Sequence, residues 1–222
     1  MSTAGLFAAL TNYWENEAIE REFNSTPSAP LDRPAESAYM TRGLVPVRLL
    51  ETGADRPEAL SHLSTEHYKS FNLVSGSIPD LRMYYTSVRQ SEYLQPKELQ
   101  FGVHCIGNQD LDSDWDKIQR LKSTLSQKIA SGKVEIDGLL ALLRDETQGR
   151  LIEQLRPEET AIFVRTYESE HFGKRQPLGT VSSTVLLYSA SGQLDVAERT
   201  FGADQRQYTD VKVRVSLPAP LR

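Results

Sequence analysis

Apolar and polar side chains alternate in six segments of the chain. Successive side chains of a strand point to opposite faces of a sheet, so this alternation predicts β-strands. The six segments form three pairs, which are residues 78–89 with 98–106, 160–170 with 180–190, and 194–201 with 208–217. The last segment has the most regular alternation, with valines on one side and Lys212 and Arg214 on the other. We expect its valine face to be buried and its charged face to be solvated.

Residues 3–22 repeat large apolar side chains every three or four positions, which predicts an amphipathic N-terminal helix. Residues 24–77 then read as an extended arm with irregular parts, because three prolines fall within the first eleven residues of this segment. Within it, residues 43–50 predict a strand that Pro46 confines to an edge of the sheet or places at the start of the strand. Residues 58–72 remain ambiguous, and residues 72–77 predict a turn.

The strongest helical pattern begins at Trp115, where five apolar residues form a single stripe. Asp112 or Ser113 supplies the N-cap, and the acidic residues around them suit the positive end of the helix dipole. Gly132 predicts the C-terminal stop. Residues 134–155 predict one strand-like or helical turn followed by a second helix.

These elements predict an α+β fold, built as a single domain over residues 1–222. In it, an antiparallel or mixed sheet of two hairpins (78–190) is packed by one or two amphipathic helices, and a further hairpin (194–217) ends the fold. Two loops, 90–97 and 169–179, are longer than tight hairpin turns require. Long loops commonly carry the contacts to other molecules, so we expect partners to bind there.

Composition narrows the class of protein. The formal net charge of −5 and the pI near 5.5 disfavour a surface that mainly binds phosphates. Cys105 is the single cysteine, which excludes an intrachain disulfide. We expect its thiol to lie in the core and the protein to be made in the cytosol. The sequence has neither a signal-peptide pattern nor a run of about 18 apolar residues, so we expect no membrane span.

Alternate aspartates suggest a calcium-binding loop at first sight. They are Asp110, Asp112, Asp114 and Asp116. Such a loop needs glycine at its sixth position and glutamate at its twelfth, where this chain has Trp115 and Leu121. We therefore interpret these carboxylates as helix-capping groups.

The four histidines lack the spacing of metal ligands, and neighbouring His104 and Cys105 point to opposite faces of a strand. No phosphate-binding, dinucleotide-binding or serine-nucleophile motif is present. The sequence thus predicts no catalytic, cofactor-binding or metal-binding residue, no cofactor, and a protein that is not an enzyme.

The order of elements resembles the tail terminator proteins of long-tailed bacteriophages. The resemblance covers residues 3–22 and 78–190: an N-terminal helix, a hairpin, the helix opened by Asp112-Ser-Asp-Trp115, and a second hairpin with a long tip. It implies a virion structural protein that forms a ring, expected to be hexameric, which ends the tail tube and joins it to the neck.

The partners that the resemblance implies are further copies of the chain, the tail tube protein and a neck or connector protein. DNA would only pass through the channel, and no membrane would be involved. The arm and the two long loops would make the contacts, through Pro27, Pro30, Tyr93, Gln95, Lys97, His171, Phe172, Lys174 and Arg175.

Two alternatives come from other classes. One is a small α+β regulatory domain that binds RNA in the manner of ferredoxin-like domains, with Tyr84 and His104 as stacking groups, although the acidic charge counts against it. The other is a hydrolase without a recognisable motif, in which Asp112, Asp114 and Asp116 would serve the reaction.

Overall fold

The computed structural model describes residues 5–12, 41–53, 68, 70–89, 93–150, 157–171 and 174–220. We expected a single domain. The contacts between residues group the chain into two compact units. The first comprises Met1–Gly102, Ile106–Leu111 and Pro220–Arg222, and the second comprises Val103–Cys105 and Asp112–Ala219. Both units combine antiparallel strands with helices, which confirms the α+β class. None of the helices in the described ranges has the length and apolar composition that a membrane span requires.

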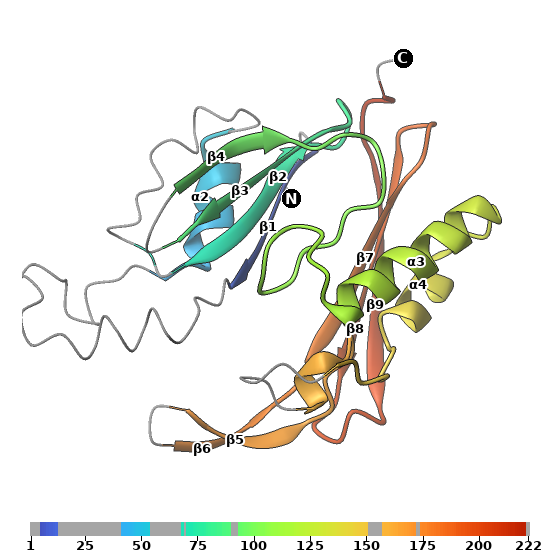
Figure 1. The fold of residues 1–222 in the computed structure, drawn as a ribbon. Coiled ribbons are helices and arrows are strands. Elements are labelled where there is room, and N and C mark those ends of the chain that lie inside the picture. The colour runs from blue at the N-terminus through green and yellow to red at the C-terminus, as the bar shows by residue number, and fades with distance from the viewer. Residues whose placement is uncertain are drawn as a thin grey trace, which may run out of the picture. The chain divides into compact units, whose positions relative to one another are not determined.

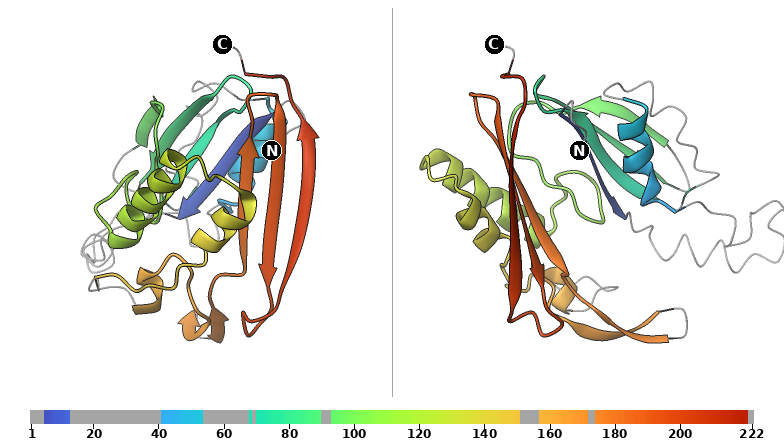
Figure 2. Two further views of the ribbon diagram at one scale, coloured as in Figure 1. Left: turned by 90° about the vertical axis from the view of Figure 1, so that its right-hand side faces the viewer. Right: turned by 180° about the vertical axis from the view of Figure 1, so that it is seen from behind.

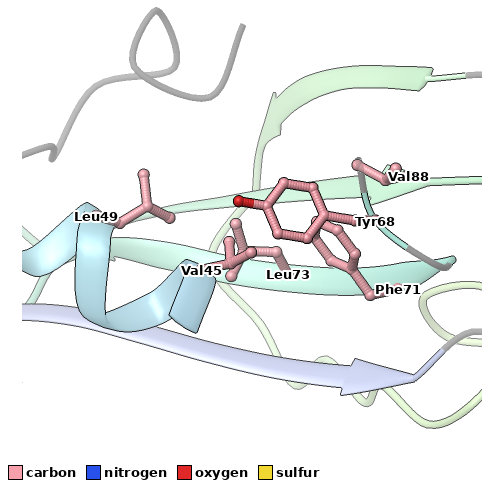
Figure 3. Close-up of a cluster of buried hydrophobic side chains, with 6 residues drawn as sticks. All are labelled: Val45, Leu49, Tyr68, Phe71, Leu73 and Val88. Carbon is pink, nitrogen blue, oxygen red and sulfur yellow. The ribbon is translucent and has the colours of Figure 1, made fainter. Parts of the chain in front are cut away.

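In the first unit, one helix covers a face of a four-stranded antiparallel sheet with the order β1-β2-β3-β4 (Figure 1). The elements are β1 (Leu6–Asn12), α2 (Leu44–Glu51), β2 (Phe71–Ser77), β3 (Arg82–Val88) and β4 (Tyr93–Glu98). Six buried side chains form the core between helix and sheet, and Figure 3 shows them: Val45, Leu49, Tyr68, Phe71, Leu73 and Val88. Their burial removes apolar surface from water, which is the main favourable term for this layer.

Two predictions for the N-terminal part of this unit are wrong. Leu6–Asn12 forms strand β1, paired with β2 along its whole length, where we expected the helix 3–22. A short apolar run fits the 3.6-residue period of a helix as well as the two-residue period of a strand. Here strand β2 provides a pairing partner for every residue of the segment. Residues 13–22 lie outside the described part of the chain.

The predicted edge strand 43–50 is helix α2 instead. Pro46 is its third residue, in the first turn, where a backbone N–H would find no acceptor within the helix. Val45 and Leu49 are four residues apart and both are buried, so one face of α2 packs on the sheet.

Of the first predicted hairpin, the strand at β3 is confirmed, whereas the predicted pairing partner of that strand is wrong. Residues 72–77, predicted as a turn, belong to β2, which pairs with β3. A Cβ at Gly76 would lie 2.0 Å from the carbonyl oxygen of Arg82, so this close pairing requires glycine. The second partner of β3 is β4, which lies largely within the predicted loop 90–97, whereas residues 99–106 form no strand. The alternation there failed as a signal because the segment leaves the sheet after Leu99, and Phe101 is 88% exposed.

In the second unit, helices α3 and α4 lie side by side on one face of the antiparallel sheet β7-β8-β9 (Figure 2). Leu140 of α4 packs against Val185 and Ala197 of the sheet. The elements are α3 (Asp116–Ala130), α4 (Ile136–Leu142), the 3-10 helix η3 (Pro157–Thr160), β5 (Tyr167–His171), β6 (Lys174–Leu178), β7 (Ser182–Tyr188), β8 (Gln193–Phe201) and β9 (Tyr208–Ser216).

The second predicted hairpin, 160–170 with 180–190, is wrong in its pairing. Strand β5 begins only at Tyr167 and pairs with β6, which lies in the predicted loop 169–179, while β7 pairs with β8. Residues 161–166 form no strand. Of the described residues in the opposite segment, Val164 bonds only to Thr180, and the side chain of Gln205 supplies further hydrogen bonds to both segments. Its amide donates to the carbonyl oxygens of Val164 (3.0 Å) and Thr180 (2.9 Å) and accepts from the Thr166 N–H (2.9 Å).

The C-terminal hairpin is confirmed, with β8 and β9 in continuous antiparallel register. The prediction of a buried valine face on β9 is wrong, because Val211 and Val213 are 57% and 51% exposed. The helices of this unit pack on the opposite face of the sheet, next to Val185 and Ala197. Alternation therefore identified the strand but not which side is covered.

Candidate functional site on helix α3

Helix α3 contributes to several polar contacts of the second unit, through Asp116, Lys117, Arg120 and Lys122. Its start differs from the prediction: Trp115 is the N-cap residue, with no side-chain cap hydrogen bond, and neither Asp112 nor Ser113 caps the helix. Its end is as predicted, since Ser131 is the C-cap and Gly132 adopts a φ of 66°. Trp115 and Ile118 are buried together with Cys105, which confirms the core role of the cysteine.

Asp112 organises a small cluster before the helix. Its carboxylate accepts hydrogen bonds from the Cys105 N–H (2.8 Å) and from Lys122 Nζ (2.9 Å), and it lies 2.8 Å from Nδ1 of His104. Burial raises the pKa of Asp112. The hydrogen bonds from Lys122, from the Cys105 backbone and from His104 lower this pKa by more than burial raises it, so the pKa lies below its usual value. The cluster fixes the segment around Cys105 to α3.

Lys117 lies in an apolar environment at the first turn of α3. Its Nζ is 3.8 Å from the centroid of the Trp115 ring and donates to the carbonyl oxygen of Glu159 at 2.9 Å. Burial lowers the pKa of Lys117 to about 8, against the opposing effect of the Glu159 charge. The lysine therefore ties η3 to α3 as a structural contact.

A hollow of about 520 Å³ opens beside α3, on the side facing residues 148–150. Seven residues line it: Asp116, Gln119, Arg120, Ser123, Gln148, Gly149 and Arg150. The hollow is shallow and wide open to solvent, so a ligand held there would stay largely exposed. Its lining combines two guanidinium groups, two amides and one hydroxyl, which can bind anions and their polar substituents, with one carboxylate, that of Asp116.

Close contact between two segments builds the wall of the hollow. A Cβ at Gly149 would lie 2.7 Å from the Cβ of Asp116, so only glycine lets this segment approach the helix so closely. The Gly149 N–H donates to Thr160 Oγ1 (3.0 Å), and the Arg150 N–H donates to the Asp116 carboxylate. These bonds hold the backbone of the wall in place.

Arg120 is held in a fixed orientation at the edge of the hollow. Its guanidinium binds the Asp145 carboxylate at 3.1 Å and the carbonyl oxygen of Thr147. Burial raises the pKa of Asp145, but hydrogen bonds from Thr147 and Arg120 lower it more, so this carboxylate stays charged at neutral pH. Arg150 differs, because its guanidinium makes no hydrogen bond or ion pair with the described residues.

The predicted contact residues lie on two separate hairpins. Tyr93, Gln95 and Lys97 belong to β4 in the first unit, where Gln95 and Lys97 are exposed. In the second unit, His171, Lys174 and Arg175 belong to the β5–β6 hairpin, where Arg175 is exposed. Pro27, Pro30 and Phe172 lie outside the described residues. A role of these side chains in partner contacts stays a prediction.

The alternate aspartates do not converge on a common point. Asp110 pairs with Arg89 in the first unit, while Asp112 and Asp116 have the partners given above in the second unit. Within the described ranges, no group of histidine, cysteine, aspartate and glutamate side chains could hold a metal ion.

Sequence reasoning missed the residues of the hollow. Arg120 was recognisable only as part of the polar face of a helix, and Gly149 and Arg150 lie in a segment without periodicity. A glycine between two polar residues is an ordinary loop signal, and nothing in the sequence indicates that this glycine touches Asp116.

A protein-family model described as Transport and Golgi organisation 2 (TANGO2) matches residues 1–203. The match covers far more than half of the chain, so the chain belongs to this family. No curated protein matches the chain.

The family match overturns the resemblance to phage tail terminators, together with the ring, the tail-tube and connector partners, the passage of DNA and the location in a virion. It supports neither the RNA-binding nor the hydrolase alternative. The structure shows why the resemblance failed, because it depended on a helix over 3–22 and on strands over 98–106 and 160–170. Those segments contain β1, an irregular segment, and η3 with the start of β5 instead.

Proposed function

We propose that this member of the Transport and Golgi organisation 2 family is a non-catalytic binding protein, which holds a small anionic ligand in the hollow beside α3. We further propose that it serves in the transport for which its family is named. The observation that carries the proposal is the presence of Arg120 and Arg150 in the lining of one hollow.

The charge balance of the lining favours an anion. The Arg120 guanidinium is already paired with Asp145, and the Asp116 carboxylate already accepts the Arg150 N–H, so the Arg150 guanidinium is the positive group of the lining that is left to bind an anion. Arg120 is oriented by Asp145 before any ligand arrives, which reduces the entropy lost on binding. The exposed guanidinium of Arg150 supplies a planar pair of donors that matches a phosphate or a carboxylate.

The lining also supports binding rather than catalysis. Arginine stays protonated at all physiological pH values, and the amides of Gln119 and Gln148 do not titrate. The one carboxylate of the lining, Asp116, already accepts the Arg150 N–H, so we expect these groups to recognise a ligand without moving protons and the ligand to leave unchanged. Gln119, Ser123 and Gln148 would select ligands that carry hydroxyl or amide groups next to the acid.

Calorimetric titration tests the proposal with three probes: inorganic phosphate, citrate and adenosine 5′-monophosphate. We expect at least one of them to bind, and the affinity to fall as salt is added, because the charges are close to solvent. Arg150→Gln should weaken this binding by about tenfold or more, which corresponds to the loss of one charge-assisted pair.

Arg206→Gln is the matched control, because it removes the same charge from an exposed turn of the same unit. Its affinity should equal that of the unchanged protein. Equal binding by the Arg150 variant, or no binding of any probe by the unchanged protein, would contradict the site. Consumption of a bound probe, followed by NMR, would contradict the non-catalytic role.

A further inference from the structure

We propose that strand β9 pairs antiparallel with β9 of a second copy of the chain, which joins two three-stranded sheets into one continuous sheet. Strand β9 is the outermost strand of its sheet (Figure 2), and within the described ranges only β8 pairs with it. Eight of its nine residues are exposed. An edge this long presents a row of backbone donors and acceptors to another strand.

Hydrogen bonds at both ends of the hairpin determine which backbone groups point outward. The Leu217 N–H donates to Gly192, and Gln207 accepts from the Gly202 N–H, so the odd-numbered residues direct their backbone groups toward β8. Backbone groups alternate along a strand. The even-numbered residues from Tyr208 to Ser216 therefore direct their N–H and C=O groups away from β8.

The charges on β9 select one register. With Val211 opposite Val211 of the second copy, Asp210 lies opposite Lys212 of that copy, and Tyr208 lies opposite Arg214. Even-numbered residues then oppose even-numbered residues, as the outward groups require. Shifting one strand by two residues would place Asp210 against Asp210 in one direction and Lys212 against Lys212 in the other, and like charges directly opposite are unfavourable.

The apolar residues of β9 favour the same pairing. Val211 and Val213 are on one face of the strand and are both more than half exposed. In this register the two Val211 side chains meet on the two-fold axis, and Val213 lies opposite Thr209 of the second copy. Association would remove β-branched apolar surface from water on this face, which stabilises cross-strand pairs.

Charged residues on an edge strand usually prevent such pairing. On β9 they are of both signs, Asp210 followed by Lys212 and Arg214, and each is already oriented by an ion pair within its own chain. Asp210 binds Arg199 at 2.8 Å, and Lys212 lies 3.2 Å from Asp137 of α4. These charges therefore restrict the register instead of blocking association. The pairing is isologous and closes as a dimer.

Sedimentation velocity over a range of protein concentrations tests the dimer. We expect a monomer–dimer equilibrium for the unchanged protein, and Lys212→Asp should weaken it by about tenfold or more, because Asp210 would then lie opposite a second carboxylate. The double exchange of Asp210→Lys with Lys212→Asp should restore it. Lys133→Asp, an equal change of charge elsewhere in the unit, should leave it unaltered. A monomer at every concentration, or no difference between the two lysine variants, would overturn the proposal.

Disulfide trapping tests the register without depending on charge. In a Cys105→Ala background, Val211→Cys places two cysteines opposite each other in a pair without ladder hydrogen bonds, where the Cα atoms are about 4.5 Å apart, within disulfide reach. Mild oxidation should crosslink this variant much faster than Val213→Cys, whose partner is Thr209. Equal crosslinking, or faster crosslinking at position 213, would contradict the register.

Discussion

Strands β2 and β9 show how differently two strands of one chain can be used. Strand β2 reads Phe-Asn-Leu-Val-Ser-Gly-Ser, with weak alternation and four polar or glycine positions, yet six of its seven residues are buried. Strand β9 alternates regularly, yet it is exposed along almost its whole length. Alternation thus reports that a segment suits a strand, whereas burial depends on what covers each face.

The polar residues of β2 are buried because they have partners within their own unit. The Asn72 side chain is fully buried, donates to the carbonyl oxygens of Gly107 (3.2 Å) and Gln109 (2.9 Å), and accepts from the Tyr85 hydroxyl (3.0 Å). The apolar residues of β9 have no equivalent cover in their sheet. A buried polar group costs stability unless it is paired, so β2 is the strand in which substitutions should be severe.

The largest effect is expected from truncating the apolar core of β2. Phe71→Ala removes a fully buried ring that packs edge-on against Tyr68, with centroids 5.9 Å apart, and should lower the free energy of unfolding by about 3–5 kcal/mol. Val213→Ala on β9, measured at low protein concentration, should cost about 0.5 kcal/mol or less. Denaturant unfolding of both variants makes the comparison, and similar losses would show that β9 is covered after all.

Asn72→Ala should have the next largest effect, a loss of about 2–3 kcal/mol. It leaves two carbonyl oxygens and the Tyr85 hydroxyl without this partner, and it releases residues 106–110 from the sheet. Asn108→Ala is the control, because its amide makes one exposed bond to the Asn12 carbonyl oxygen and should cost little. Hydrogen exchange should increase over residues 106–110 in the first variant alone. An unchanged exchange pattern would mean that Asn72 does not anchor this segment.

The sequence predicted the fold class, the hairpin of β8 with β9 and the end of α3, because each has a strong local signal. The regular alternation of β9 and the Ser131-Gly132 stop are of this kind. The sequence did not predict β1 or α2. Their short apolar runs suit a helix as well as a strand, and their conformation depends on packing or pairing with β2. It also missed β5–β6, because both strands are polar.

The candidate site was beyond the reach of sequence patterns for a related reason. The hollow depends on Gly149 touching Asp116 and on Arg120 reaching Asp145, and both contacts join residues more than twenty positions apart. No periodic signal records such contacts. The cluster of aspartates was visible, but Asp110, Asp112 and Asp116 bind different partners and do not form one site.

Asp112 is intermediate between the buried polar residues of β2 and the exposed residues of β9. Its carboxylate is about one quarter exposed and has three hydrogen-bonding neighbours. Its folded pKa lies below the ordinary value of 3.8, so its stabilisation is present above that value and is lost as the pH falls through the folded pKa. Asp112→Asn should therefore cost roughly 1 kcal/mol at pH 7, less than Asn72→Ala, and progressively less below pH 3.8. Unfolding free energies of the unchanged protein and of Asp112→Asn, measured at pH 7 and at a pH well below 3.8, give the cost of the substitution at each pH. A cost that stays constant with pH would assign the loss to shape and hydrogen-bond geometry rather than to charge, and would place Asp112 with the buried polar groups of β2.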